Sequence, residues 1–262
     1  MSNYELITFE VTDGVATLTI NRPEVANAFN AQVGREIFEA SLECSSNQDI
    51  RAVILTGAGK FFCAGGDLAE FSQAENLDAL LKQMTTHLHG AISRFARMNA
   101  PLIGAINGTA GGGGFSLMCA CDIIYLADSA KLTMAYTAAG LTPDASSTYF
   151  LPRMIGTQRA LELALTNRRL TADEALAWGL VNYVVPAAEV LSEAQKLAAQ
   201  LAAGPTLAYG ATKKLMRNSF TESLESQMED EAQSIVAMTY TADAQEGIDA
   251  FLNKRKPQFN GR

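Results

Sequence analysis

Two short, wholly apolar runs, each followed by a glycine-rich segment and a helical pattern, constrain the fold of this chain more than any other feature. Ala52–Gly57 and Leu102–Ile106 have the length and composition of strands that are buried on both faces. A further apolar strand, Ile123–Leu126, follows the second of these helices, so strand, turn, helix and strand recur along the chain. This alternation predicts an α/β fold.

The segments on either side of this core have simpler patterns. Residues Leu6 to Ile20 alternate around Asp13-Gly14, which predicts a β-hairpin, and apolar residues at helical spacing predict a helix from about Asn30 to Ser46. Beyond Thr157, strand formers gather only in Leu180–Val185, so the remainder should be helical. The expected C-terminal helices span residues 187–203, 206–218, 222–239 and 242–254.

The last two of these helices carry apolar side chains that little else in the chain can cover. We therefore expect a neighbouring subunit to cover them. The side chains concerned are Leu224, Met228, Ile235, Val236 and Met238.

The composition excludes several classes of protein. A formal net charge of −8 over 262 residues disfavours binding to nucleic acid or to an anionic membrane. The first residues form no signal peptide, and no apolar run is long enough to span a membrane, so a soluble, cytoplasmic protein is expected. The cysteine spacing matches neither a disulfide framework nor a zinc site, and no metal is expected. Reduced, buried thiols are therefore predicted for Cys44, Cys63, Cys119 and Cys121.

Two glycine-rich loops, Phe61–Leu68 and Ile106–Phe115, each stand between a buried strand and a helix. Backbone amides and the positive end of a helix dipole there favour negative charge, and amides from two loops can hold one oxygen on which charge develops. Either loop alone could simply be a tight helix–sheet contact. Neither has the sequence of a P-loop or of a dinucleotide-binding fingerprint, so phosphate hydrolysis and NAD binding are not expected.

Six segments, in order along essentially the whole chain, resemble the crotonase (enoyl-CoA hydratase/isomerase) superfamily. They are NRPEVANAFN (21–30), FCAGGDL (62–68), INGTAGGGG (106–114) with CDI after it, GLTPD (140–144), EALAWGLVNYVV (174–185) and EGIDAFLNKRKPQF (246–259). The resemblance implies a spiral of ββα units over residues 1–200 and a helical trimerisation region over residues 201–262. It also implies a homotrimer or a dimer of trimers, and an acyl-CoA thioester substrate with no separate cofactor, because coenzyme A is part of the substrate.

The same resemblance assigns roles to residues of the two loops. The amides of Ala64 and Gly113 are expected to form an oxyanion hole for the thioester carbonyl, and Arg22 should supply a local positive charge for the nucleotide. The acyl pocket is expected to involve Met84, Leu88, Phe115 and Tyr136. The residues expected to contact coenzyme A or the substrate are Arg22, Val25, Ala26, Phe62, Ala64, Gly65, Gly66, Asp67, Leu68, Gly112, Gly113 and Tyr136.

The two glutamates that act on water in hydratases of this superfamily match Ser116 and Tyr136 here, so hydration of the usual kind is not expected. The carboxylate of Asp144, which follows Pro143, remains. In isomerases of the superfamily that convert 3-enoyl to 2-enoyl thioesters, a Pro-Asp at this place is the acid/base. From the local sequence alone, Asp144 could equally be the N-cap of a helix.

Other functions remain open. Aryl-CoA dehalogenases carry an Asp in this loop as a nucleophile, a His near the position of His89, and a sequence similar to Leu165–Arg168. By itself His89 could be a partly exposed helix residue, and Ser116 with His89 and Asp144 could form a hydrolase triad, although no nucleophile elbow frames the serine. The further alternatives are an atypical hydratase and a non-catalytic homologue that binds acyl-CoA or RNA. The preferred hypothesis is an enzyme of the superfamily, an isomerase that acts through an enolate.

Overall fold

The computed structural model describes residues 4–262 and confirms an α/β fold with two sheets. Within this part of the chain, the larger sheet has the strand order β1-β2-β3-β5-β7-β10, and the smaller sheet has the order β4-β6-β8-β9. Neighbouring strands are parallel except for the pairs β1/β2 and β8/β9. The strands are β1 (Ile7–Thr12), β2 (Val15–Ile20), β3 (Ala52–Gly57), β4 (Phe61–Cys63), β5 (Leu102–Ile106), β6 (Thr109–Gly111), β7 (Ile123–Ala127), β8 (Lys131–Thr133), β9 (Leu170–Thr171) and β10 (Tyr183–Val185).

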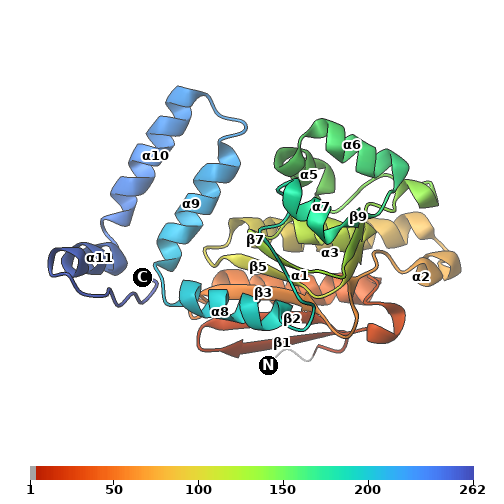
Figure 1. The fold of residues 1–262 in the computed structure, drawn as a ribbon, viewed down its shortest axis with the longest axis horizontal. Coiled ribbons are helices and arrows are strands. Elements are labelled where there is room, and N and C mark those ends of the chain that lie inside the picture. Colours follow the sequence, from red (N-terminus) through yellow and green to blue (C-terminus); the bar gives the residue numbers. More distant parts are fainter. Residues whose placement is uncertain (1–3) are drawn as a thin grey trace.

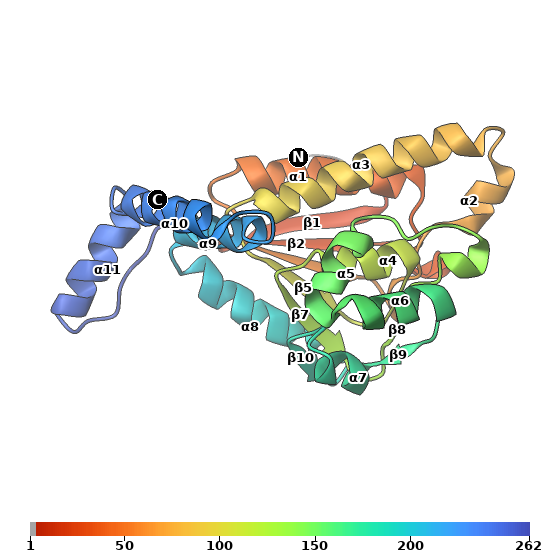
Figure 2. The ribbon, with the colours of Figure 1, turned by 90° about the horizontal axis from the view of Figure 1, so that it is seen from above.

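Helices cover both faces of the larger sheet. In Figure 2, α1 and α3 lie together on one face and α8 lies on the other, while α10 and α11 project away from both sheets (Figure 1). The helices are α1 (Ala31–Ser46), α2 (Leu68–Gln73), α3 (Leu77–Arg97), α4 (Gly112–Cys119), α5 (Ser147–Ile155), α6 (Thr157–Thr166), α7 (Ala172–Ala177), α8 (Val190–Ala202), α9 (Thr206–Asn218), α10 (Leu224–Met238) and α11 (Ala242–Leu252), with 3-10 turns η1 (Pro23–Val25) and η2 (Thr137–Ala139).

Consecutive strands of a repeated unit are divided between the two sheets. In each of the pairs β3/β4, β5/β6 and β7/β8, the first strand joins the larger sheet, the second joins the smaller sheet, and a helix follows. This is the expected spiral of ββα units. The turn from β3 to β4 requires a glycine, because a Cβ at Gly57 would overlap the backbone of Phe61 and Phe62.

Most elements expected from the sequence are present. Asp13 and Gly14 both have positive φ in the turn between β1 and β2, and Asn30 caps α1 by accepting a hydrogen bond from the amide of Val33. The strand expected over Leu180–Val185 is shorter, because the amide of Leu180 instead donates to Ala175 at the end of α7.

The four cysteines are buried and free, as expected. Burial raises the pKa of the Cys63 thiol to about 12, so this thiol in the first glycine loop is not a nucleophile at neutral pH. Among residues 4–262, no helix is long and apolar enough to cross a membrane.

Candidate active site

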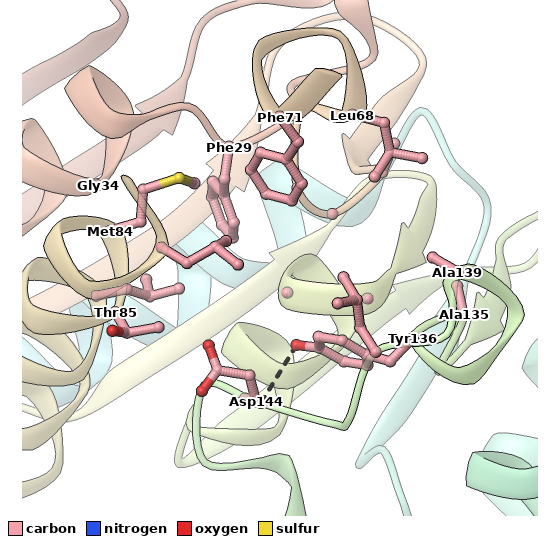
Figure 3. Close-up of a pocket in the computed structure, with 18 of the residues that line it drawn as sticks. Phe29, Gly34, Leu68, Phe71, Met84, Thr85, Ala135, Tyr136, Ala139 and Asp144 are labelled. Atoms are coloured by element: carbon pink, nitrogen blue, oxygen red, sulfur yellow. Dashed lines mark hydrogen bonds between the residues drawn. The ribbon is translucent and has the colours of Figure 1, made fainter. Parts of the chain in front are cut away.

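A cavity of about 360 Å³ lies between the two glycine loops, α3 and the loop before α5. Figure 3 shows Asp144 and Tyr136 on one side of this cavity and Phe29, Phe71 and Leu68 on the other. Of the residues that line it within the described chain, Asp144 is the only acid, and most others are apolar or glycine. The cavity therefore suits a hydrophobic group held beside one carboxylate.

The two glycine loops meet at the wall of this cavity. A Cβ at Gly65 would lie 3.0 Å from the carbonyl oxygen of Gly111, and a Cβ at Gly114 would overlap the backbone of Cys63. Gly65 also has a φ of 108°, which side chains rarely allow. The glycines therefore serve close packing of α4 against the first loop, and this packing brings the amides of both loops to the same cavity.

One predicted oxyanion donor needs correction. The amide of Ala64 donates to the carbonyl of Ala26 at 3.0 Å, so it is already engaged. Two residues further on, Gly66 lines the cavity, and its amide has no protein acceptor among residues 4–262. Gly113 lines the cavity as expected, and as the second residue of α4 it has no acceptor within the helix. The pair of available amides is therefore Gly66 and Gly113.

Asp144 is not an N-cap. Helix α5 begins after its N-cap residue Ser146, and its first amides donate no capping hydrogen bond to the side chain of that residue. The Asp144 carboxylate instead contacts His89 of α3, with 2.8 Å between Asp144 Oδ1 and His89 Nε2. These side chains are 38% and 52% exposed, so the pair remains open to solvent.

His89 faces a second cavity, which it lines together with Ser93, Ser146 and Lys214. Leu88, the preceding residue of α3, lines the first cavity. The His89–Asp144 pair therefore lies where the two cavities adjoin.

Two hydroxyl groups occupy the places that match the hydratase glutamates. Tyr136 Oη lies 2.9 Å from Ser116 Oγ and donates to the carbonyl of Asp144 at 3.2 Å (Figure 3). Burial raises the pKa of the Tyr136 hydroxyl above its ordinary value, so it stays protonated. Within residues 4–262, Ser116 Oγ contacts the carbonyl of Gly112 and the hydroxyl of Tyr136 and makes no hydrogen bond to His89, so a Ser116–His89–Asp144 triad is not formed.

Several predicted contact residues lie outside the cavity. Arg22 donates to Asp67 at 3.1 Å and to the carbonyl of Ala28, so its charge is compensated by that carboxylate. The Phe62 side chain is fully buried and does not line the cavity, so any contact of this residue with coenzyme A would involve its backbone. Phe115 is also fully buried and does not line the cavity, where it was expected. Val25 and Ala26 lie at the turn η1 beside the first loop.

The other predicted residues divide as follows. The cavity is lined by Ala64, Gly65, Gly66, Leu68, Met84, Leu88, Gly112, Gly113, Tyr136 and Asp144, in agreement with the expectation. Phe29 and Thr85, which also line it, were not predicted. Phe29 could have been suspected, because it belongs to the NRPEVANAFN segment, and in the structure it exchanges backbone hydrogen bonds with Gly65 and Asp67.

Comparison with known proteins agrees with this geometry. The model of the enoyl-CoA hydratase/isomerase family matches residues 10–262. The chain is 38% identical to 1,2-epoxyphenylacetyl-CoA isomerase of Escherichia coli K12 over 98% of this chain and 99% of the relative. It is 39% identical to a 4-chlorobenzoyl coenzyme A dehalogenase of an Arthrobacter species, over 95% and 91%.

Solved structures give the same result. The enoyl-CoA hydratase of Bacillus anthracis superposes with a TM-score of 0.93 at 33% identity, over 98% of this chain and all of that one. The enoyl-CoA hydratase of a Polaromonas species gives a TM-score of 0.90 at 34% identity, over 97% and 99%. The cavity between two glycine loops, the spiral of ββα units and these matches together show that the chain belongs to the enoyl-CoA hydratase/isomerase family, the crotonase superfamily.

Proposed function

We propose that this protein is an acyl-CoA thioester isomerase that moves a double bond from the 3-position to the 2-position of an enoyl group. The observation that carries the proposal is that Asp144 is, among residues 4–262, the one acid lining a cavity that Gly66 and Gly113 also line. A carboxylate beside an oxyanion site can form an enolate and return its proton elsewhere.

Asp144 can serve as both the proton acceptor and the proton donor of this reaction. The Asp144 carboxylate takes a proton from carbon 2 of the 3-enoyl thioester, and the electron pair is delocalised onto the thioester oxygen, which accepts hydrogen bonds from the two amides. The protonated Asp144 then gives a proton to carbon 4, so the double bond ends between carbons 2 and 3. One amide donor of this kind contributes about 2.7–4 kcal/mol in the transition state.

The coenzyme A part of the substrate is proposed to lie outside the cavity, along η1 and the first loop. Val25 and Leu68 are both exposed there, and Arg22 is held against Asp67 beside them. Titration calorimetry with a saturated acyl-CoA tests this placement, and absence of heat at millimolar thioester would contradict it.

The relatives support the proposal and also name its main competitor. One relative is an isomerase of a phenylacetyl-CoA derivative, and another is a dehalogenase of a chlorobenzoyl thioester. The His89–Asp144 contact favours the second candidate, because an imidazole beside an aspartate can assist attack of water on an aspartyl ester. In that reaction Asp144 attacks the ring carbon, the halide leaves with its bonding pair, and water hydrolyses the ester.

The hydroxyls at Ser116 and Tyr136 favour neither hydration nor its reversal. A burial-raised pKa keeps the tyrosine neutral, and no second carboxylate lines the described cavity to activate water. An atypical hydratase is therefore the less favoured alternative.

A panel of 3-enoyl, 2-enoyl and haloaroyl thioesters tests the proposal. We expect conversion of the 3-enoyl thioesters, and Asp144→Asn should bind a saturated thioester normally but lose a factor of about 10² to 10⁴ in turnover. An Asp144→Asn variant with full turnover, or a wild-type enzyme active only on haloaroyl thioesters, would refute the isomerase assignment.

A further inference from the structure

The loop that carries Asp144 is conformationally demanding. Ala145 and Ser146, the two residues that follow it, have φ values of 51° and 69°. Side chains disfavour this left-handed region, so two such residues in succession persist only where other contacts hold them.

Besides the contact of its carboxylate with His89, Asp144 accepts three hydrogen bonds at one backbone atom, its carbonyl oxygen. It accepts hydrogen bonds from Tyr136 Oη at 3.2 Å, from Ser147 Oγ at 2.9 Å and from the Ser147 amide at 3.3 Å. The two serine donors belong to the loop itself, whereas Tyr136 belongs to the segment after β8. The tyrosine is therefore the donor that ties the Asp144 peptide to a different part of the fold.

The tyrosine is in turn tied to the helix of the oxyanion site. Ser116 is fully buried in α4, one turn after Gly113, and its Oγ lies 2.9 Å from Tyr136 Oη. Ser116 Oγ also donates to the carbonyl of Gly112 at 3.2 Å, as a serine inside a helix commonly does, and either hydroxyl can be the donor in the contact between Ser116 and Tyr136. Tyr136 Oη thus links Ser116 of α4 to the carbonyl of Asp144.

We propose that Tyr136 and Ser116 are positioning residues that fix the Asp144 carboxylate relative to the amide of Gly113. The contacts from Ser116 Oγ to Tyr136 Oη and from Tyr136 Oη to the carbonyl of Asp144 connect α4, which carries the amide of Gly113, with the loop that carries Asp144. The inference rests on the proposed role of Asp144. It adds that two hydroxyls at the places matched to the hydratase glutamates act through Asp144 and exchange no proton with the substrate.

The chemistry requires such a link because the proton acceptor and the oxyanion donors act on neighbouring atoms of one substrate. Misplacement by about 1 Å can cost about 10²-fold in rate. Substrate affinity should depend much less on the link, since the apolar wall and both amides are unchanged.

The test uses Tyr136→Phe, which keeps the ring and removes the hydroxyl, with Tyr183→Phe as the control, because Tyr183 is half exposed and remote from the cavity. For Tyr136→Phe we expect kcat to fall about tenfold to a hundredfold with KM changed by less than about threefold. Exchange of the α hydrogens of a saturated acyl-CoA in D2O, which needs Asp144 but no double bond, should slow by the same factor.

A second variant, at Ser116, tests whether the contacts from Ser116 through Tyr136 to Asp144 act as one unit. Ser116→Ala removes the hydroxyl that contacts Tyr136 and should lower kcat by about twofold to fivefold, and the double variant should be no slower than Tyr136→Phe alone, because Ser116 acts on Asp144 through Tyr136. Circular dichroism checks that each variant is folded.

The outcomes separate this inference from the proposed function. A wild-type enzyme without isomerase activity refutes the proposed function. With an active wild type, an unchanged kcat for Tyr136→Phe, a rise of KM alone, or single effects that multiply in the double variant would each overturn the positioning role.

Discussion

His89 Nε2 lies 2.8 Å from Asp144 Oδ1, and this contact joins a helix residue to a loop residue 55 positions later in the chain. Asp144 lines the cavity between the glycine loops, and His89 lines the second cavity. Asp144 thus has two kinds of neighbour, an apolar cavity where a substrate would lie and an imidazole that is half exposed. The two candidate reactions use this pair differently.

Replacing His89 by Leu should distinguish these uses. In an isomerase, the exposed contact between His89 and Asp144 contributes only about 0–1 kcal/mol, so 3-enoyl turnover should fall by less than about sixfold. In a dehalogenase, loss of the base should make an aspartyl ester accumulate, visible by mass spectrometry of the quenched enzyme. His87→Leu is the matched control, because His87 lies on the same helix and packs against Phe38. Loss of isomerase activity as large as that of Asp144→Asn would contradict a minor role for His89.

Gly114 and Gly34 offer a second matched comparison, in stability. A Cβ at Gly114 would overlap the backbone of Cys63, whereas one at Gly34 of α1 would meet nothing closer than 3.8 Å. Gly114→Ala should therefore destabilise the protein strongly or prevent folding, and Gly34→Ala should be neutral or stabilising by up to about 1 kcal/mol. Urea unfolding measures both, and equal stabilities for the two variants would contradict the close packing of the loops.

The sequence predicted the elements whose signals are local. Apolar runs, the Asp13-Gly14 turn and helical spacing are properties of adjacent residues, and the corresponding elements were found. The strands β4, β6 and β8 have only three residues each, so no periodicity could reveal them or the second sheet. Their pairing depends on contacts between distant segments.

The site was predictable to a similar extent. The glycine loops and the Pro-Asp pair could be recognised as sequence motifs. Which amide is available to a ligand could not, because the amide of Ala64 donates to the carbonyl of Ala26, whereas the amide of Gly66 has no acceptor among residues 4–262. The burial of Phe62 and the pairing of His89 with Asp144 likewise follow from tertiary packing. Residue type therefore indicated the kind of site, and the fold determined which atoms are available.

The buried thiols predict how the free energy of unfolding depends on pH. Burial raises the pKa of Cys44 and of Cys63 from 9.0 to about 12, so the unfolded state loses these protons at lower pH than the folded state. The free energy of unfolding should consequently be unaffected by these groups below pH 9 and should decline as pH rises from about 9 to about 12. Native protein at pH 8 should not react with iodoacetamide, whereas urea-unfolded protein should be alkylated at all four cysteines. Rapid native alkylation of Cys63 would contradict its burial.

The C-terminal helices give a prediction on assembly. Ile235 and Val236 of α10 and Phe251 and Leu252 of α11 are between 55% and 84% exposed in the single chain, on helices that project from the sheets (Figure 1). Such an apolar surface suggests a covering partner, and we expect a homotrimer or a dimer of trimers. Sedimentation at micromolar concentration should give three or six times 28.0 kDa, and Ile235→Glu should lower that mass. Val11→Glu, on β1, is the control, and a wild-type monomer would contradict the prediction.

The last prediction follows the fate of oxygen at Asp144. If the carboxylate only carries a proton, a single turnover of a 3-enoyl thioester in H2¹⁸O should leave Asp144 unlabelled, because no bond to its oxygen atoms other than O–H forms or breaks. If the carboxylate attacks an aryl ring, hydrolysis of the resulting ester places one ¹⁸O in Asp144, since water attacks the carboxyl carbon. Peptide mass spectrometry of the segment containing Asp144 after a single turnover reads the label directly. In deuterium oxide the isomerase should also introduce deuterium at carbon 4, because Asp144 is 38% exposed and its proton can exchange with solvent during the reaction. An unlabelled Asp144 after turnover of a 3-enoyl thioester supports the proton-transfer role, whereas ¹⁸O in Asp144 after haloaroyl turnover by an enzyme inactive on enoyl thioesters would assign it as a nucleophile.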